Sequence, residues 1–300
     1  MHMKVEIFRR TVKDRKRGNS YELLYHLKKG IEAAGDEAVI VNESRSGPTV
    51  EGEMTPTAPM AAMFGYGGDQ QMHHTKGRRR ELADNCRAKK IPLITFDGGL
   101  LSSFGNISTS PDHHFRVSLY TPMNDGDFLS DNSPNDRWEM LVKKFDVKYE
   151  PWRKSNQDDP IIFVMQPKDN WSMNELDPID WFNGVYEKLR PATSRKFIVR
   201  PHPNNVSNIL ERENELPDDV EIQYTQKHFK GDEKKYYRFH FQEAIANAHA
   251  VVTHNSTASV DSCIRGIPTF CTSDLALCWD VCNKDLNDIE TPKTLDRTQW

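Results

Sequence analysis

The sequence predicts an α/β protein with two Rossmann-like domains that face a central cleft. Short runs rich in Val, Ile and Phe alternate along the chain with segments of helical periodicity. Several of these runs end in loops of Gly, Asn, His or Pro, as buried parallel strands do. The chain has 300 residues, 37% of them hydrophobic, which suits two domains of about 150 residues each. We expect a first domain at 1–148, a linker at 149–160 and a second domain at 161–300.

The first domain is predicted to follow the order strand, helix, strand, strand, helix, strand. Its first strand covers 5–8. A helix capped by Asn19 or Ser20 then carries apolar residues at helical spacing until Gly35 ends it. The later elements are strands at 38–41, 60–66 and 91–96, a basic helix at 76–89, a polar loop at 121–136 and a short helix at 136–147. This alternation is typical of a Rossmann-like domain.

The second domain is predicted to begin with a strand at 160–165. A helix from Asp177 to Leu189 follows, because the proline after Asp177 suits the first turn of a helix. Further strands are expected at 196–200, 220–224, 249–253 and 267–271, with helices at about 239–248 and 256–265. The final residues, 296–300, resemble the start of a helix, so we expect that a C-terminal helix is missing.

Composition and short motifs exclude several classes of protein. The net charge of −4 weighs against a protein that coats nucleic acid, and no run of eighteen apolar residues exists to span a membrane. No signal peptide, Walker A sequence or G-x-G-x-x-G after a first strand is found, which argues against a P-loop kinase and a Rossmann dehydrogenase. The five cysteines lack C-x-x-C spacing, so core thiols are favoured over a zinc site and no metal site is predicted.

Two polar motifs of the second domain each follow a predicted strand. One is Arg200-Pro-His202-Pro, and the other is Asn255-Ser256-Thr257. Ligands of parallel sheets bind outside the carboxyl ends of the strands, so both motifs are expected at one crevice. The two prolines make His202 rigid, and the Ser-Thr pair can offer hydroxyl and backbone N–H groups to an anion. The pair of motifs favours a clamp for nucleotide phosphates; the alternative is an ordinary turn and helix cap.

In the first domain, Asp97 ends a predicted strand just before Gly98 and Gly99. The two glycines leave its carboxylate open to a substrate, so we expect Asp97 to be catalytic and the glycines to lie on the acceptor side. An Asx-turn is the alternative. A basic cluster is also assigned to the acceptor side; it comprises Lys76, Arg78, Arg79 and Arg80. It indicates either a solvated helix face or a contact with a polyanionic acceptor.

These motifs resemble those of the bacterial capsule glycosyltransferases that transfer Kdo, and more loosely those of bacterial sialyltransferases. His202 and the following proline match the HP motif of these families, and Ser256 matches their S motif. The loop after the strand at 160–165 is similar to their Gln-x-x-Asp-x-x-Ser loop, at Gln166, Asp169 and Ser172.

Two further positions extend the resemblance, and two depart from it. Asp261 stands where the family has an acid. The segment from Asp97 to Ser102 resembles the catalytic Glu-Asp-Gly-Phe-Leu-Arg-Ser motif, but Phe96 replaces its first acid and Leu101 its arginine. The loss of that arginine puts a Kdo donor in doubt. The second half of the chain also looks like uncharacterised bacteriophage-encoded glycosyltransferases.

The resemblance implies a GT-B glycosyltransferase in the cytoplasm of a bacterium or of a phage-infected host. Such an enzyme moves a sugar from a nucleotide-sugar donor, here a UDP- or CMP-sugar, to a hydroxyl acceptor, without a cofactor or metal ion. The expected donor-binding residues are Gln166, Asp169, Ser172, Arg200, His202, Asn255, Ser256, Thr257 and Asp261. Asp261 would accept from ribose hydroxyls, or would be a solvated helix residue.

The acceptor is the least determined part of this prediction. A glycan is favoured. One alternative is a DNA-modifying phage enzyme that glycosylates a hydroxymethylated base, which the basic cluster of the first domain suggests and the overall acidity does not. Another alternative is a non-catalytic module that binds a sugar nucleotide or serves polysaccharide export. The sugar, the stereochemical outcome and the oligomeric state stay open.

Overall fold

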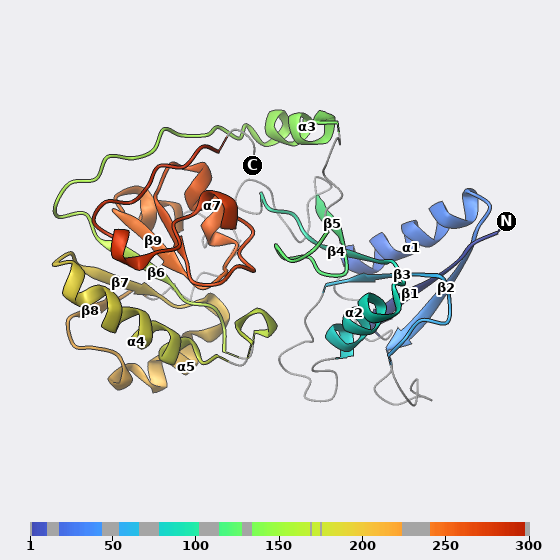
Figure 1. Ribbon diagram of the computed structural model, residues 1–300, viewed down its shortest axis with the longest axis horizontal. Coiled ribbons are helices and arrows are strands. Elements are labelled where there is room, and N and C mark those ends of the chain that lie inside the picture. The colour runs from blue at the N-terminus through green and yellow to red at the C-terminus, as the bar shows by residue number, and fades with distance from the viewer. Residues whose placement is uncertain are drawn as a thin grey trace. The chain divides into compact units, whose positions relative to one another are not determined.

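The structure is a computed structural model, which describes residues 2–10, 18–43, 54–65, 78–101, 114–127, 134–168, 170–174, 176–223 and 241–297. The chain divides into two compact units, Met1–Asn135 and Asp136–Trp300. Each unit contains one five-stranded sheet with helices, and each is considered by itself (Figure 1). Within these ranges, no helix combines the length and hydropathy needed to cross a membrane.

Unit 1 is a doubly wound sheet whose strand order is β2-β1-β3-β4-β5. Its strands are β1 (Lys4–Arg10), β2 (Glu37–Glu43), β3 (Met60–Phe64), β4 (Leu93–Gly98) and β5 (Phe115–Leu119). Its helices are α1 (Gly18–Ala33) and α2 (Arg78–Lys89). The first four strands are parallel, and β5 runs antiparallel to β4. The predicted rhythm of this domain is confirmed, whereas β5 was missed.

The core of unit 1 forms where the apolar face of α1 packs on the first strands. Val5 and Ile7 of β1 are fully buried and cluster with Leu24 of α1 and Ala62 of β3. The β-branched residues of β1 suit a strand, and the leucines of α1 recur at helical spacing. Burial of this stripe against the sheet therefore determines where the helix lies.

Unit 2 contains a fully parallel sheet whose strand order is β10-β9-β6-β7-β8. Its strands are β6 (Ile161–Val164), β7 (Phe197–Arg200), β8 (Val220–Ile222), β9 (Ala250–Thr253) and β10 (Thr269–Cys271). Its helices are α3 (Asp136–Phe145), α4 (Pro178–Leu189), α5 (Val206–Glu211) and α7 (Ala258–Ile264). Short 3₁₀ helices lie at Trp171–Met173, Arg190–Ala192, Pro203–Asn205, Glu213–Glu215, Trp279–Val281 and Leu286–Asp288.

The central strand β6 is buried on both faces, which explains its continuous apolar run. On one face, the Phe163 ring lies 4.9 Å from that of Phe182 in α4 and 5.0 Å from that of Phe197 in β7. Helix α4 has the predicted limits because the Asp177 carboxylate accepts from the Ile179 N–H at 2.9 Å and caps its first turn. Both ends of α4 agree with the helix predicted from Asp177 to Leu189.

The segment 149–160 belongs to unit 2 and runs along it. The Glu150 N–H donates to the Ile264 carbonyl at 2.9 Å, and the Arg153 N–H donates to the Gly266 carbonyl at 2.7 Å. The Trp152 indole N–H donates to the Leu295 carbonyl at 2.9 Å. The division between the units falls at 135/136 instead of within 149–160. Prolines and mixed charge mark an irregular segment, but they do not distinguish a linker between domains from a segment that packs along its own domain. We call residues 149–153, which pack in this way, the strap. The predicted helix at 239–248 lies partly outside the described residues.

Candidate functional site

Three loops of unit 2 leave the sheet side by side. In the sheet register, Val164 at the end of β6 lies opposite Arg200 at the end of β7 and Thr253 at the end of β9. Counted along unit 2, the strands are arranged in the order 3-2-1-4-5, so the winding reverses between β6 and β9. Ligands of doubly wound sheets bind in the crevice at such a reversal. The motifs that follow residues 164, 200 and 253 therefore meet where a ligand is expected.

A buried hydrogen-bond network spans this reversal between the loops after β6 and β9. Gln166 Nε2 donates to Ser172 Oγ at 2.8 Å and to Asn255 Oδ1 at 2.7 Å. The Asn255 N–H donates to Gln166 Oε1 at 3.1 Å, and Asn255 Nδ2 donates to the Ser172 carbonyl at 2.8 Å. All three residues are buried. We call Gln166, Ser172 and Asn255 the amide bridge. Because their polar groups satisfy one another, their direct role is to hold the two loops together.

Two polar residues that the sequence analysis did not select extend the amide bridge. Asn170 Oδ1 accepts from both the N–H and the hydroxyl of Ser172, each at 3.1 Å. Ser273, in the loop after β10, accepts from Asn255 Nδ2 at 3.4 Å. Asn170 lies inside the Gln-x-x-Asp-x-x-Ser loop, so its place in the sequence could have marked it as a site residue. Nothing in the local sequence marks Ser273, because its contact depends on the neighbouring strand.

The loop after β7 presents a histidine without a formal charge. Burial lowers the pKa of His202 to about 4, so its imidazole is neutral near pH 7. A neutral imidazole still offers one N–H donor. The His202 carbonyl accepts from the Asn205 N–H at 2.7 Å, which fixes the turn after the strand. Arg200 is buried, its Nη1 donates to Gln223 Oε1 at 2.8 Å, and burial lowers its pKa.

The S-motif segment forms the first turn before α7. Ser256 Oγ accepts from the Ala258 N–H at 3.3 Å, and the Ser256 carbonyl accepts from the Ser259 N–H at 3.0 Å. Thr257 is exposed. Asp261 is only 6% exposed, so it is not a solvated helix residue. The helix predicted at 256–265 is α7, which begins at Ala258, two residues later than expected. Asp169, the remaining donor-side residue, lies outside the described residues.

Beside the amide bridge, a ring cluster connects α4 with the loops after β9 and β10. The Trp181 indole N–H donates to Thr272 Oγ1 at 2.9 Å, and His254 Nδ1 lies 2.9 Å from the same hydroxyl. The two ring centroids are 6.4 Å apart. Burial lowers the pKa of His254, which favours the neutral ring that can accept from the hydroxyl. Sequence reasoning missed this cluster because its members come from three separate elements.

In unit 1, the carboxylate of Asp97 is fixed by an arginine from β5. Arg116 Nη2 donates to Asp97 Oδ2 at 2.7 Å, because the antiparallel register places the two residues opposite each other. Asp97 Oδ1 accepts from the Gly98 N–H at 2.8 Å. The Asp97 side chain keeps 30% exposure, against 10% for Arg116. Asp97 is therefore oriented by its neighbours and still reachable by a substrate.

Gly99 and His114 form a tight contact next to Asp97. A Cβ atom at Gly99 would lie only 1.9 Å from Cδ2 of His114, so a larger residue cannot occupy this position without displacing the ring. The His114 ring accepts from the Leu101 N–H at 3.3 Å through Nε2. At Gly98, in contrast, no atom lies within 4 Å of an added Cβ. Gly99 is thus required by close packing against His114, whereas Gly98 borders open space.

The basic cluster of α2 is only partly directed at solvent. Arg79 is 6% exposed, and its Nη1 donates to the carbonyls of Phe64 and Gly65 at the end of β3. Arg80 is exposed. Lys76 and the side chain of Arg78 lie outside what the structure describes. Arg79 therefore holds the end of β3. Of the two cluster side chains that the structure describes, Arg79 and Arg80, only Arg80 is on the surface.

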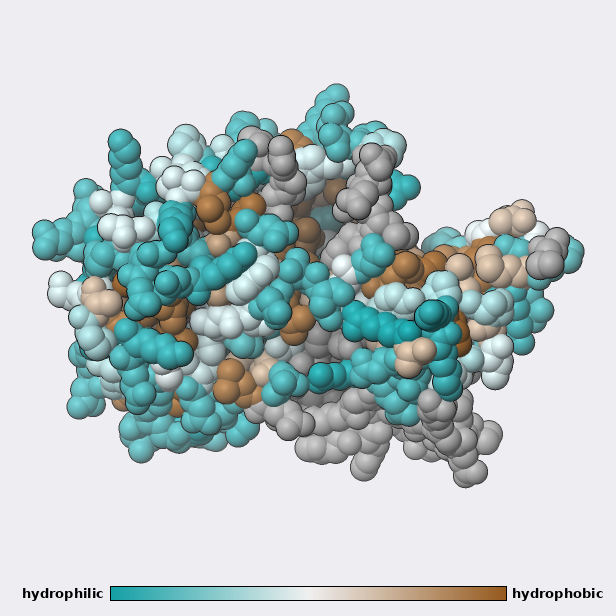
Figure 2. Space-filling view, viewed as in Figure 1, coloured by the Kyte–Doolittle hydropathy of each residue, from teal (hydrophilic) through white to brown (hydrophobic). Residues whose placement is uncertain are grey.

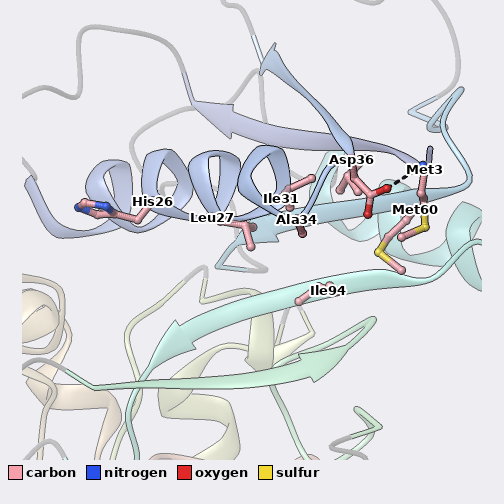
Figure 3. Close-up of a pocket in the computed structure, with 11 residues that line it drawn as sticks. Met3, His26, Leu27, Ile31, Ala34, Asp36, Met60 and Ile94 are labelled. Carbon is pink, nitrogen blue, oxygen red and sulfur yellow. Dashed lines mark hydrogen bonds between the residues drawn. The ribbon is translucent and has the colours of Figure 1, made fainter. Parts of the chain in front are cut away.

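A cavity of about 480 Å³ lies elsewhere in unit 1, between α1 and the strands β3 and β4. Apolar side chains such as Leu27, Ile31, Met60 and Ile94 line it, and the Met3 N–H donates to Asp36 Oδ1 at 2.9 Å at one end (Figure 3). Figure 2 shows hydrophobic residues on the surface along α1. The cavity contains none of the predicted site residues.

Comparison with solved structures identifies the fold. No protein-family profile and no curated protein matches the sequence. The KpsC β-Kdo 2,4-transferase of Thermosulfurimonas dismutans superposes with a TM-score of 0.53 at 15% identity, over 97% of this chain and 89% of that chain. The KpsC β-Kdo 2,7-transferase of the same organism gives 0.44 at 11% identity, over 96% and 88%. The UDP-GlcNAc 2-epimerase of Methanocaldococcus jannaschii gives 0.33 at 12% identity, over 93% and 87%.

The first of these likenesses, together with the two sheets, shows two Rossmann-like domains of the GT-B architecture. The predicted fold class is confirmed. The resemblance to capsule Kdo-transferases is confirmed at the level of the fold.

Proposed function

We propose that this protein is a glycosyltransferase that moves a sugar from a nucleotide-sugar donor to a hydroxyl group of a glycan. The observation that carries the proposal is the amide bridge, which joins two motif loops at the reversal point of a doubly wound sheet. The GT-B fold, shared with a Kdo-transferase, supports the same class of enzyme.

The donor's phosphates are proposed to bind at the loops that the amide bridge holds in place. His202, in the loop after β7 on the other side of β6, supplies a neutral N–H donor, and Ser256 and Thr257 supply hydroxyls in the loop after β9. Hydrogen-bond donors aimed at a leaving phosphate stabilise the charge that develops as the glycosidic bond breaks. Such donors work best where the site does not need to reorganise, and a buried amide network supplies that rigidity. A UDP- or CMP-sugar is the proposed donor, and no metal ion is assigned to this step.

Asp97 is proposed to act on the acceptor. Its carboxylate would take the proton from the acceptor hydroxyl while that oxygen forms a bond to the anomeric carbon and the nucleotide phosphate leaves. Arg116 is proposed as the positioning residue, since it occupies one carboxylate oxygen from the neighbouring strand. Arg116 comes from a different part of the chain than the arginine of the family motif, whose place Leu101 takes.

A DNA acceptor is the alternative that depended on the basic cluster, and the burial of Arg79 weakens its support. Arg80 is exposed. Binding to phosphates would appear as a steep loss of DNA affinity with salt, about 0.9 log unit per log unit of salt for each contact. A non-catalytic module would bind a sugar nucleotide without turning it over.

Turnover of Asp97→Asn tests the proposed function. With a nucleotide-sugar donor and a glycan acceptor, we expect release of the nucleotide to fall by at least about a hundredfold, while donor affinity stays within a few-fold. Asp84→Asn, on α2 of the same unit, is the control and should retain full turnover. Full activity of Asp97→Asn would remove Asp97 from the mechanism. Donor binding without turnover in the parent protein would favour the non-catalytic alternative.

A further inference from the structure

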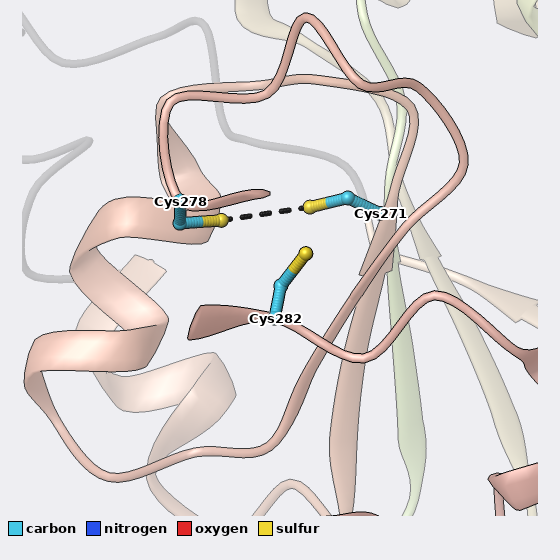
Figure 4. A group of neighbouring side chains, drawn as sticks. All are labelled: Cys271, Cys278 and Cys282. Carbon is cyan, nitrogen blue, oxygen red and sulfur yellow. Dashed lines mark hydrogen bonds between the residues drawn. The ribbon is translucent and has the colours of Figure 1, made fainter. Parts of the chain in front are cut away.

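Three cysteine thiols of unit 2 meet in the interior beside β10. Cys271 ends β10, and Cys278 and Cys282 lie in the loop that follows it, before and after the 3₁₀ turn Trp279–Val281 (Figure 4). Their sulfur atoms all lie within 4.8 Å of one another, and the sulfurs of Cys271 and Cys278 are 3.6 Å apart. None of the three residues is more than 1% exposed.

The backbone holds this loop closed at its base. The Asn283 N–H donates to the Thr269 carbonyl at 2.7 Å, and the Cys271 N–H donates to the Asn283 carbonyl at 3.1 Å. The residue after Cys282 is thereby fixed against β10, and a series of tight turns between Ser273 and Val281 places Cys278 on the inside. The three sulfurs converge through this closure, which is why their spacing of six and three intervening residues gave no sign of it. Sequence reasoning favoured separate core thiols for that reason.

The sulfur positions suit a single metal ion. Three points no more than 4.8 Å apart have a common centre within about 2.8 Å of each, and a zinc–thiolate bond is about 2.3 Å, so small rotations of the side chains suffice. Thiolates are the ligands that soft metal ions select. We propose that Cys271, Cys278 and Cys282 form a binding site for one thiophilic metal ion of the Zn²⁺ class. The Trp279 carbonyl oxygen accepts from the Cys282 thiol at 3.5 Å.

The site is compatible with folding in the absence of a metal ion. Hydrogen bonds with Cys278 and Cys282, together with burial, raise the pKa of Cys271 well above its usual value. A hydrogen bond with Cys271 lowers the pKa of Cys282, but one with Cys278 and burial raise it overall, to about 12. Without an ion the thiols of Cys271 and Cys282 are therefore neutral and tolerated in an apolar interior, and an ion replaces their protons when it binds.

Occupation of the site would fix the loop after β10. That loop carries Thr272, which contacts the rings of Trp181 and His254, and Ser273, which contacts the amide bridge. A metal ion bound to the three sulfurs would connect the loop's start, middle and end. It has a structural role in this proposal, independent of any sugar transfer.

Titration of the reduced, chelator-treated protein with Co²⁺ tests the proposal, since Co²⁺ occupies thiolate sites that bind Zn²⁺ and gives a sulfur-to-metal charge-transfer absorption. We expect the absorption to saturate at one ion per chain, and Zn²⁺, which binds such sites more tightly than Co²⁺, to abolish it by competition. Because an ion that binds only the folded state stabilises it, Zn²⁺ should also raise the melting temperature of the parent protein.

Two cysteine variants separate this site from other thiols. Cys278→Ser should lose the absorption, whereas Cys263→Ser, at an equally buried position on α7, should keep it. If Cys278→Ser fails to fold, the melting temperature of the parent protein with and without Zn²⁺ still decides. The proposal is overturned by a parent protein that shows no charge-transfer band, or by one whose melting temperature does not respond to Zn²⁺. An equal loss of the band in Cys263→Ser would also overturn it. None of these outcomes depends on nucleotide-sugar binding.

Discussion

At the scale of single residues, the candidate donor site depends on buried side-chain amides that satisfy one another. Both N–H groups of the Gln166 amide are used within the site, and so are both N–H groups of the Asn255 amide. A buried polar group that loses its partner costs about 1–3 kcal/mol, so such a network is strongly specified. The network keeps two loops at a fixed distance, which is what a phosphate clamp requires.

Asn255→Ala should therefore lower the free energy of unfolding by about 1–3 kcal/mol, because Gln166 and the Ser172 carbonyl lose their partners. It should also weaken nucleotide binding. Chemical denaturation and calorimetric titration measure the two effects. Asn183→Ala is the matched control, since its amide donates to the Glu215 carbonyl at a half-buried position of α4, outside the amide bridge. A smaller loss of stability in Asn255→Ala than in Asn183→Ala would contradict the role of the amide bridge.

His202 should make the protein sensitive to acid. Its pKa is lowered by burial from 6.5 to about 4 in the folded chain, so between these values the unfolded chain binds the proton first. The corresponding stability is fully present above pH 6.5 and is lost as pH falls towards 4, by at most about 3 kcal/mol.

His202→Gln should flatten the dependence of unfolding free energy on pH between 4 and 6.5, measured by denaturant titrations at several pH values. Some dependence will remain, since burial also lowers the pKa of His249 and His254. An unchanged slope in His202→Gln would show that its imidazole is not buried in solution.

Gln166, Ser172 and Asn255 were selected because a motif is recognised from residue types and their order along the chain, which requires no knowledge of the fold. They did not reveal that these residues contact one another, since hydrogen bonds across the sheet depend on strand order. Ser273 was invisible for the same reason. Arg116 was missed because its partnership with Asp97 requires the antiparallel pairing of β4 and β5.

At the scale of elements, the strap (149–153) packs against the C-terminal end of α7 and the residues that follow it. Gly266 has a φ of +69°, and an added Cβ would lie 2.0 Å from the Pro151 carbonyl oxygen. Gly184, in α4, has no atom within 4 Å of an added Cβ. One glycine is therefore required by the backbone and by its neighbour, and the other is an ordinary helical position.

Gly266→Ala should destabilise unit 2 by more than about 1 kcal/mol, because it adds left-handed strain to a clash with backbone. Gly184→Ala should stabilise it by up to about 1 kcal/mol, because alanine is the better helix former. Thermal unfolding of both variants measures these shifts. A Gly266→Ala variant as stable as the parent would contradict both the left-handed backbone at Gly266 and its contact with Pro151.

Elements with strong periodicity were predicted well, and so were short buried strands such as β7 and β9, whereas β5 and α5 were missed. Helix α4 has a cap, a first-turn proline and a buried face of six residues, so three signals agree. Strand β5 has five residues, and Val117 within it is 47% exposed, so its pattern is weak without its partner strand. Helix α5 spans six residues, fewer than two turns, and was also missed.

At the scale of the whole molecule, two Rossmann-like domains of the GT-B architecture carry different parts of the proposed reaction. The proposal assigns the donor site to unit 2 and Asp97 with its arginine to unit 1. The two-domain fold was predictable, because each half of the chain repeats the strand–helix alternation. The domain boundary was harder to predict, since the composition of a segment indicates that it is irregular but not on which domain it packs.

The most direct test of the account is a melting-temperature panel with UDP-, CMP-, GDP- and dTDP-sugars. A ligand at a hundred times its dissociation constant stabilises the folded state by about 2.7 kcal/mol, so a specific donor gives a clear upward shift. We predict that sugars of one nucleotide raise the melting temperature of the parent protein and that Asn255→Ala reduces the shift while Asn183→Ala keeps it. Absence of a shift with every nucleotide sugar, or an equal shift in Asn255→Ala, would contradict the assignment of the donor site.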